Sequence, residues 1–207
     1  MLTVITVLRS GPEYNAEKVL AVHAMVERNL TIPHEFICLS DVEILGVKTI
    51  PLKHYWPGWY SKMEIYRPDL PEGPKLYLDL DTSIVSNMDS VLEAAAASGK
   101  PFVILRDFYR GAVNPLSMGS GFMYWNTDMS FLYHWYLKNP VEIRGGDQVI
   151  LEQLLNVKAV AFWQDITESV CSFKVHIRPL NQILPKYSVV CFHGKPRPWE
   201  QTLVPYK

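Results

Sequence analysis

Cysteine is scarce in this 207-residue chain, and neither sign of charge dominates. The three cysteines, Cys38, Cys171 and Cys191, are odd in number, far apart and flanked by apolar residues. That pattern is typical of buried reduced thiols and not of a disulfide framework, so we expect the protein in the cytoplasm. A net charge of −1 gives no basis for general binding to nucleic acid or to anionic membranes.

Long hydrophobic runs are also missing. No apolar stretch approaches the roughly 20 residues that cross a bilayer, so we expect no transmembrane segment. The apolar start of the chain, residues 1–8, is too short for a signal-peptide core, and no small-residue cleavage site follows it. What the chain does have is 48% hydrophobic residues, a globular composition with enough apolar surface for one core. We therefore expect a single domain over residues 1–207.

Strand-like and helix-like segments alternate along the chain. Short β-branched or apolar runs predict strands over residues 2–8, 35–39, 47–50, 75–80, 101–105, 121–125, 157–162 and 188–192. Apolar residues at helical spacing predict helices over 13–30, 89–97, 128–137 and 147–155, with a short helix between residues 57 and 68. We expect an α/β fold in which helices flank a mixed, mostly parallel central sheet.

The sharpest local motif is Asp79-Leu80-Asp81, at the end of the apolar strand predicted over 75–80. Neighbouring buried carboxylates repel each other, and a divalent cation removes that cost. Aspartates two apart on a strand project from one face, so both can reach one ion. Carboxylate oxygens suit Mg²⁺ or Mn²⁺, which often completes its shell with phosphate oxygens. The alternative is a solvated strand end where the two aspartates simply begin a loop.

A phosphatase is a competing interpretation of the same residues. Haloacid-dehalogenase phosphatases carry an Asp-x-Asp-x-Thr motif after their first strand, with the first aspartate as the nucleophile. Here Thr82 comes one place early, and the motif follows about two β-α units. These departures disfavour the phosphatase.

Two further motifs lie towards the C-terminus. His193-Gly194-Lys195-Pro196-Arg197 follows a β-branched strand, and such a loop can offer backbone amides and an arginine fork to phosphate while a neutral imidazole binds metal. Gly146-Asp147-Gln148 opens an apolar helix. For Asp147 a plain helix cap is the alternative, because aspartate often caps helices.

Taken in order, these motifs resemble those of family 8 glycosyltransferases, which include glycogenin and the bacterial lipopolysaccharide galactosyl- and glucosyltransferases. The similar segments run from residue 56 onward. They are a lysine-bearing helix (59–66), the Asp-x-Asp strand (76–82), an Asn-Met-Asp segment (87–89), a Ser-Gly-aliphatic strand (120–126), the Gly-Asp-Gln helix start (146–148) and a histidine-glycine-lysine-proline-tryptophan loop (193–199).

The C-terminal loop departs from the family pattern at two positions. The family histidine usually precedes its glycine by three residues, a place held here by Cys191, whereas His193 adjoins Gly194. Arg197 stands where the family usually has lysine. Since residues two apart on a strand end share a face, His193 stays the predicted metal ligand, with Cys191 as the alternative.

The resemblance implies the GT-A fold and a set of site residues. It implies metal ligands at Asp79, Asp81 and His193, with Lys62 and Arg197 near a diphosphate. It places the nucleobase and ribose at the end of the first strand, around Leu8, Arg9, Ser10 and Tyr14. It assigns Asp147 and Gln148 to catalysis and sets Ser120 and Gly121 at the donor sugar, with Leu80 and Gly194 also in the donor site.

The function that this resemblance implies is transfer of a sugar from a nucleotide diphosphate, with UDP as the expected nucleotide and Mn²⁺ or Mg²⁺ as the expected ion. Family 8 enzymes retain anomeric configuration, so we expect retention. The acceptor, whether glycan, lipid-linked sugar or protein, is not specified by the sequence. A degenerate domain that binds nucleotide or carbohydrate without turnover is the alternative. Trp56, Trp59 and Trp125 are expected in the core rather than as sugar platforms.

Overall fold

The computed structural model describes residues 1–206 and contains a central seven-stranded sheet. Its strand order is β3-β2-β1-β4-β7-β6-β8. Every neighbouring pair is parallel except those formed by β7, which is antiparallel to both β4 and β6. The mixed, mostly parallel sheet is confirmed. The strands are β1 (Leu2–Leu8), β2 (His34–Ser40), β3 (Lys48–Pro51), β4 (Lys75–Leu78), β6 (Phe102–Arg106), β7 (Met118–Trp125) and β8 (Val160–Phe162).

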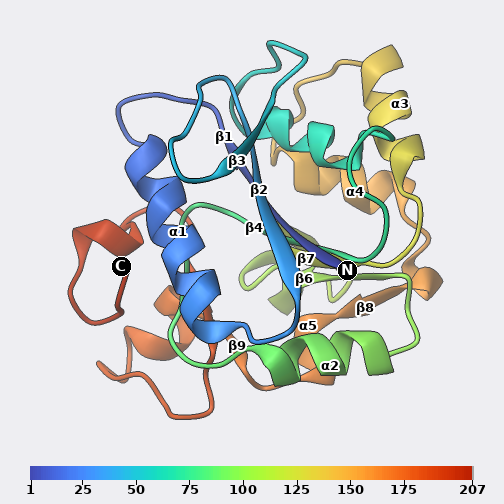
Figure 1. Ribbon diagram of the computed structural model, residues 1–207. Coiled ribbons are helices and arrows are strands. Elements are labelled where there is room, and N and C mark those ends of the chain that lie inside the picture. The colour runs from blue at the N-terminus through green and yellow to red at the C-terminus, as the bar shows by residue number, and fades with distance from the viewer. Residues whose placement is uncertain (207) are drawn as a thin grey trace.

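Helices cover both faces of this sheet, which gives three layers (Figure 1). One face packs against α1 (Ala16–Asn29), α2 (Asp89–Ala97) and α5 (Trp163–Ile166). The other packs against the 3-10 helix η1 (Gly58–Tyr66), α3 (Ser130–Lys138) and α4 (Asp147–Leu154). Adjacent strand residues point to opposite faces, so Val4 joins the first core and Ile5 the second.

Helix α1 shows why the sequence folds in this way. Its buried residues, Val19, Val22, Met25 and Val26, recur at the spacing of one helix face. The helix begins at Ala16 and not at residue 13 as predicted, because the preceding residues form a loop closed by a hydrogen bond from the Gly11 amide to the Tyr14 carbonyl. That loop lies at the carboxyl end of β1, the edge of the sheet where the candidate site forms.

A second, three-stranded sheet joins the Asp-x-Asp motif to the C-terminal loop. It consists of β5 (Thr82–Ile84), β10 (Val189–Cys191) and β9 (Val170–Ser172), with β10 in the middle. Cys191 pairs with Thr82, so the Asp-x-Asp turn before β5 lies beside the loop after β10. The remaining elements are η2 (Arg110–Ala112), η3 (Val157–Ala159), the π-helix η4 (Phe173–Ile177) and η5 (Pro198–Glu200).

In two predicted strands, a turn or a 3-10 helix replaces part of the expected extended segment. The strand predicted over 75–80 ends at Leu78, and the Thr82 amide donates to the Asp79 carbonyl at 3.0 Å, which closes a turn. The two aspartates are therefore neighbours through a tight turn, and the prediction that they project from one strand face is wrong. The segment predicted as a strand over 157–162 begins as η3 and is extended only from Val160.

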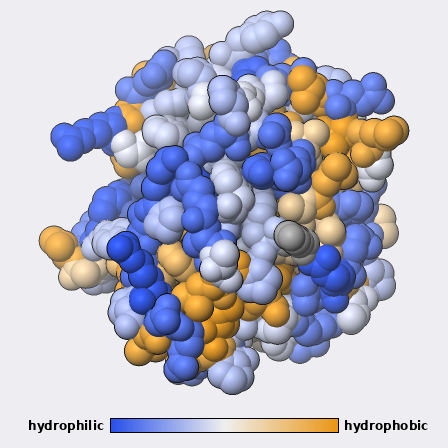
Figure 2. Space-filling view, turned by 90° about the vertical axis from the view of Figure 1, so that its left-hand side faces the viewer, coloured by the Kyte–Doolittle hydropathy of each residue, from blue (hydrophilic) through white to orange (hydrophobic). Residues whose placement is uncertain are grey.

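No helix within residues 1–206 combines the length and the apolar character that a membrane span requires. The face that carries α1 and the C-terminal segment is mixed, with hydrophobic patches lying between hydrophilic side chains (Figure 2).

Candidate active site

A pocket of about 700 Å³ opens at the carboxyl ends of β1 and β4. Thirteen of the fifteen residues predicted for the site line it: Arg9, Tyr14, Lys62, Asp79, Leu80, Asp81, Ser120, Gly121, Asp147, Gln148, His193, Gly194 and Arg197. Leu8 does not line the pocket. Its side chain is fully buried in the core beneath α1, and the preceding Val7 faces the pocket, because strand residues alternate between faces.

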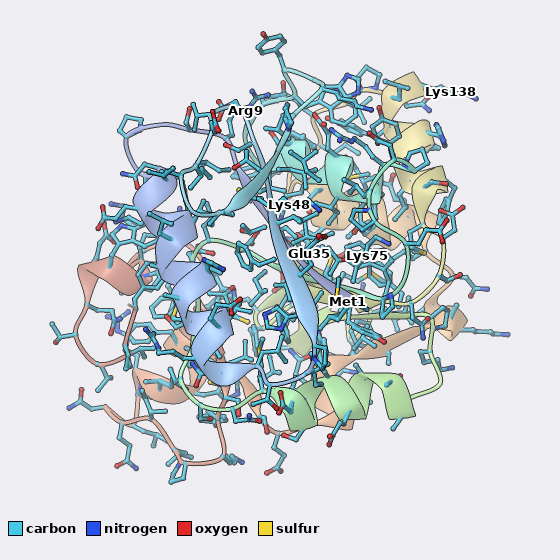
Figure 3. All side chains as sticks on the ribbon, viewed as in Figure 1. Met1, Arg9, Glu35, Lys48, Lys75 and Lys138 are labelled. Carbon is cyan, nitrogen blue, oxygen red and sulfur yellow. The ribbon has the colours of Figure 1, made fainter. Side chains whose placement is uncertain are left out.

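Arg9 marks the end of β1 and ties it to the loop before η1. In Figure 3 it lies at the opposite end of β1 from Met1. Its guanidinium donates to the carbonyls of His54 (2.8 Å) and Trp56 (3.1 Å) and lies 5.7 Å from the centre of the Tyr55 ring. These bonds fix one wall of the pocket. The predicted Ser10 lies outside the lining and bonds Asp41 instead.

Asp79 and Asp81 crowd two carboxylates at the floor of the pocket. Asp81 is buried, whereas about a third of the Asp79 side chain is exposed. Burial and the nearby charge of Asp79 raise the pKa of Asp81 to about 7, although Arg197 and Lys62 act in the opposite direction. The two nearby cations therefore do not fully offset burial and the repulsion between the two carboxylates, and a divalent cation would be favoured there.

Gly121 makes room for this carboxylate pair. Its carbonyl accepts a hydrogen bond from the Asp79 amide at 2.9 Å, which joins the turn to β7. A Cβ at Gly121 would lie 3.1 Å from Asp79 Oδ2, tighter than nine in ten contacts of this kind. A side chain at this position would press on the carboxylate, so glycine preserves the floor of the pocket.

Arg197 carries the positive charge nearest to Asp81. Its guanidinium donates to Asp81 Oδ2 at 2.6 Å and to both carboxylate oxygens of Glu13 at 3.1 and 3.2 Å. Burial opposes its charge, but the bond with Glu13 and the charge of Asp81 outweigh burial and raise the pKa of Arg197. Glu13 was not among the predicted residues, since a single glutamate in a loop gives no recognisable pattern.

Lys62 lies at the centre of a buried charge cluster. It projects from η1, donates to Ser120 Oγ at 2.8 Å and pairs with Asp147 (3.2 Å) and Asp79 (3.4 Å). Burial alone would lower the pKa of Lys62, but the charges of Asp147 and Asp79 raise it above its ordinary value. Lys62 therefore keeps its charge and links η1, β7, α4 and the Asp-x-Asp turn.

Asp147 is not a plain helix cap. The N-cap position of α4 belongs to Gly146, and Asp147 is the first helical residue. Its carboxylate is buried and pairs with Lys62 and Ser120. Burial raises its pKa, while Lys62 and Ser120 favour the charged form. Gln148 follows on the same helix and lines the pocket.

His193 lies in the pocket wall as a neutral imidazole. Its Nε2 and Ser172 Oγ are 2.9 Å apart and share a hydrogen bond, and its ring packs against Phe108 and Tyr109. Burial lowers the pKa of His193 to about 4. Cys191, at the alternative position, also lines the pocket, and burial raises the pKa of its thiol well above the ordinary value.

A three-ligand metal centre is not assembled in the part of the chain that the structure describes: no three His, Cys, Asp or Glu side chains there are close enough to hold an ion. The paired carboxylates of Asp79 and Asp81 fit a divalent cation by their chemistry and by the raised pKa of Asp81. His193 has suitable chemistry as a neutral imidazole, but its Nε2 is paired with Ser172.

The three tryptophans considered in the sequence differ in burial. Trp125 is fully buried and Trp56 packs against the same core. Trp59 is 61% exposed and lines the pocket, so the expectation of a core position is wrong for this residue. Trp59 is the second residue of η1, ahead of the buried stretch that begins at Tyr60.

Comparison with known proteins identifies the fold. No protein-family model matches the sequence, and no curated protein matches it. The chain is similar to the galactosyltransferase LgtC in complex with donor and acceptor sugar analogs, with a TM-score of 0.62 and 16% identity over 98% of this chain and 91% of that chain.

Two further solved structures extend this similarity. The glycosyltransferase GlyE of Streptococcus pneumoniae TIGR4 aligns with a TM-score of 0.64 and 13% identity, over 98% of this chain and 57% of that one. The apo bifunctional glycosyltransferase WbbM aligns with a TM-score of 0.59 and 8% identity, over 96% of this chain and 46% of that one. The chain therefore has the GT-A fold of glycosyltransferases, which confirms the resemblance expected from the motifs at the level of the fold.

Proposed function

We propose that the protein is a glycosyltransferase that transfers a sugar from a nucleotide diphosphate sugar to an acceptor, with UDP as the proposed nucleotide. The observation that carries this proposal is the pocket, in which the paired carboxylates of Asp79 and Asp81 lie beside two cationic side chains, Lys62 and Arg197. Cationic side chains offset the negative charge of a diphosphate. A metal ion between the carboxylate pair and the diphosphate would remove the repulsion between these two negatively charged groups.

Asp79 and Asp81 would hold Mn²⁺ or Mg²⁺, with His193 as the candidate third ligand. When bound, the ion supplies positive charge that offsets the charge of the diphosphate leaving group. Arg197, held by Glu13, adds a bidentate donor at the same place. Leu8, Arg9 and Tyr14 are proposed for the nucleobase and ribose, with Leu8 acting only through the strand end that it anchors.

Asp147 and Gln148 are proposed to act on the transferred sugar. Lys62 keeps the Asp147 carboxylate charged although it is buried, and a charged carboxylate accepts strong hydrogen bonds from sugar hydroxyls. Gln148 offers both a donor and an acceptor beside it. Retention of anomeric configuration is part of the proposal and rests on the resemblance to family 8.

A hydrolysis and transfer assay tests the proposal. The purified chain is incubated with UDP-, GDP- and TDP-sugars and Mn²⁺ or Mg²⁺, and the released nucleoside diphosphate is measured. Release from a UDP-sugar supports the glycosyltransferase. Binding of UDP without any release would favour the degenerate binding domain instead. The phosphatase has no support from the fold, and hydrolysis of phosphate monoesters is its test.

We also propose that residues 1–207 act as one domain and in the cytoplasm. Both sheets contribute walls to one pocket, through Asp81 and Thr82 at β5 and Cys191 at β10. All three cysteines are buried and unpaired, as in proteins of reducing compartments.

A further inference from the structure

Trp59 breaks the burial pattern of its own helix. Every residue of η1 from Tyr60 to Tyr66 is buried, yet the Trp59 side chain next to them is 61% exposed and lines the pocket. An aromatic side chain of this size normally buries roughly 150–250 Å². A single exposed aromatic residue is common on protein surfaces, so a functional role for Trp59 has to be argued from the residues around it.

A close contact fixes the indole at the rim of the pocket. Helix η1 lies beside α4 (Figure 1), and Trp59 packs on the backbone at the start of α4. A Cβ at Gly146 would lie 2.6 Å from the indole Nε1 and 2.8 Å from its Cδ1. Gly146 also has a φ of +77°, a conformation that favours glycine. Because Gly146 has no side chain, the indole can pack against the start of α4 and still remain exposed to solvent.

The position of this indole is beside the residues proposed for the transferred sugar. Gly146, which it contacts, is followed directly by Asp147 and Gln148, both of which line the same pocket. The rim therefore places an exposed indole beside a helix start that carries a carboxylate and an amide.

We infer that Trp59 forms the acceptor subsite and that the acceptor is a saccharide, with one ring packed on the indole. This inference rests on the proposed function and names its acceptor class. The electron-rich indole face attracts the slightly positive C–H face of a pyranose, while the surrounding polar groups bind its hydroxyls. An alkyl chain would instead require an apolar groove, whereas Trp59 packs on Gly146, which the polar residues Asp147 and Gln148 follow.

Binding to an array of immobilised mono- and oligosaccharides, in the presence of UDP and Mn²⁺, tests this inference. The wild type is expected to bind at least one class of glycan. Trp59→Ala is expected to bind it at least ten-fold more weakly, which corresponds to about 1.4 kcal/mol. Trp59→Tyr, which keeps an aromatic face, is expected to recover most of the affinity. A wild type that binds no glycan, or a Trp59→Ala variant that binds equally well, would overturn it.

Phe131→Ala is the matched control. Phe131 is an aromatic residue, 48% exposed, in a surface hollow on α3 that shares no lining residue with the active-site pocket. Glycan binding by this variant is expected to equal that of the wild type. Near-native circular dichroism and melting temperatures of the Trp59 variants show that the fold is kept, as expected for an exposed side chain.

The two proposals fail in different ways. A chain that releases UDP from a UDP-sugar but transfers only to peptides or long-chain alcohols keeps the proposed function and overturns the saccharide acceptor. A chain that binds glycans through Trp59 but never consumes a donor keeps the subsite and overturns the glycosyltransferase. In steady-state kinetics, Trp59→Ala is expected to raise the KM of the acceptor sugar at least ten-fold and to change the KM of the donor far less.

Discussion

At the scale of single residues, Asp81 gives the sharpest test of metal binding, because its carboxylate is buried beside another carboxylate and accepts a hydrogen bond from Arg197. Asp81→Asn keeps the shape of the side chain and removes the charge that would hold a cation. We expect donor turnover to fall at least about 100-fold, the magnitude typical of losing a major electrostatic contact in catalysis. The rate of UDP release measures it.

The control for this substitution is Asp128→Asn, which alters an aspartate whose side chain bonds Ser130, outside the active-site pocket. We expect it to keep wild-type turnover. Excess EDTA should have the same effect on the wild type as the loss of Asp81. Full activity in EDTA would show that the carboxylate pair holds no metal.

His193 and Cys191 permit a second test at this scale. We expect His193→Ala to weaken Mn²⁺ and UDP binding together, by about ten-fold or more, because a metal ligand acts on both. Cys191→Ser should be mild, since the neutral thiol is a poor ligand when its pKa is raised by burial. Calorimetric titration with Mn²⁺ and UDP gives both affinities. The reverse pattern would assign the ligand position to Cys191.

At the scale of secondary-structure elements, the strongly periodic segments were predictable, whereas two of the shortest strands, β5 and β9, were not. Helix α1 has four buried residues at helical spacing, and β1 is a seven-residue run of leucine and β-branched residues, so both were expected. Strands β5 and β9 have three residues each, too few for a period to appear. They are extended only because they pair with β10, a contact between distant parts of the chain.

Helix α4 carries the third prediction. Asp147→Asn keeps a hydrogen-bonding side chain but removes the charge that pairs with Lys62. We expect kcat to fall about ten-fold or more while the donor KM changes little, because the carboxylate acts on the sugar and not on the diphosphate. Steady-state kinetics with a UDP-sugar measure both constants.

Glu152→Gln is the control on the same helix, since Glu152 bonds Arg110 and the Met118 amide outside the pocket. It should leave the kinetics at the wild-type level. Unchanged kinetics for Asp147→Asn would instead show that its charge has no part in transfer.

At the scale of the whole molecule, the order of motifs predicted which segments would meet, and the structure shows how they meet. Thirteen predicted residues line one pocket, although they come from segments between Arg9 and Arg197. Glu13 and the exposed face of Trp59 were not predicted. Both depend on packing between distant segments: Glu13 on Arg197 from the last loop, and Trp59 on Gly146 at the start of α4. Sequence spacing does not encode such contacts.

The last prediction concerns the stability of the whole fold. UDP and Mn²⁺ should stabilise the protein together, and neither alone should match the pair, because the ion lacks phosphate ligands without UDP and the diphosphate lacks compensating charge without the ion. Ligand at about 100 times its Kd adds roughly 2.7 kcal/mol to the free energy of unfolding. At about 2–4 °C per kcal/mol for a chain of this size, the melting temperature should rise by about 5–10 °C.

Asp81→Asn should remove this synergy while leaving the melting temperature of the free protein close to that of the wild type, since the asparagine amide fills the same volume. Differential scanning fluorimetry of both proteins, with UDP, Mn²⁺, the pair and neither, makes the comparison. Phosphate mimics with Mg²⁺ should give no comparable shift, because the pocket places its cations for a diphosphate. If no nucleoside diphosphate shifts the melting temperature, with or without metal, the glycosyltransferase proposal fails at the step of donor binding.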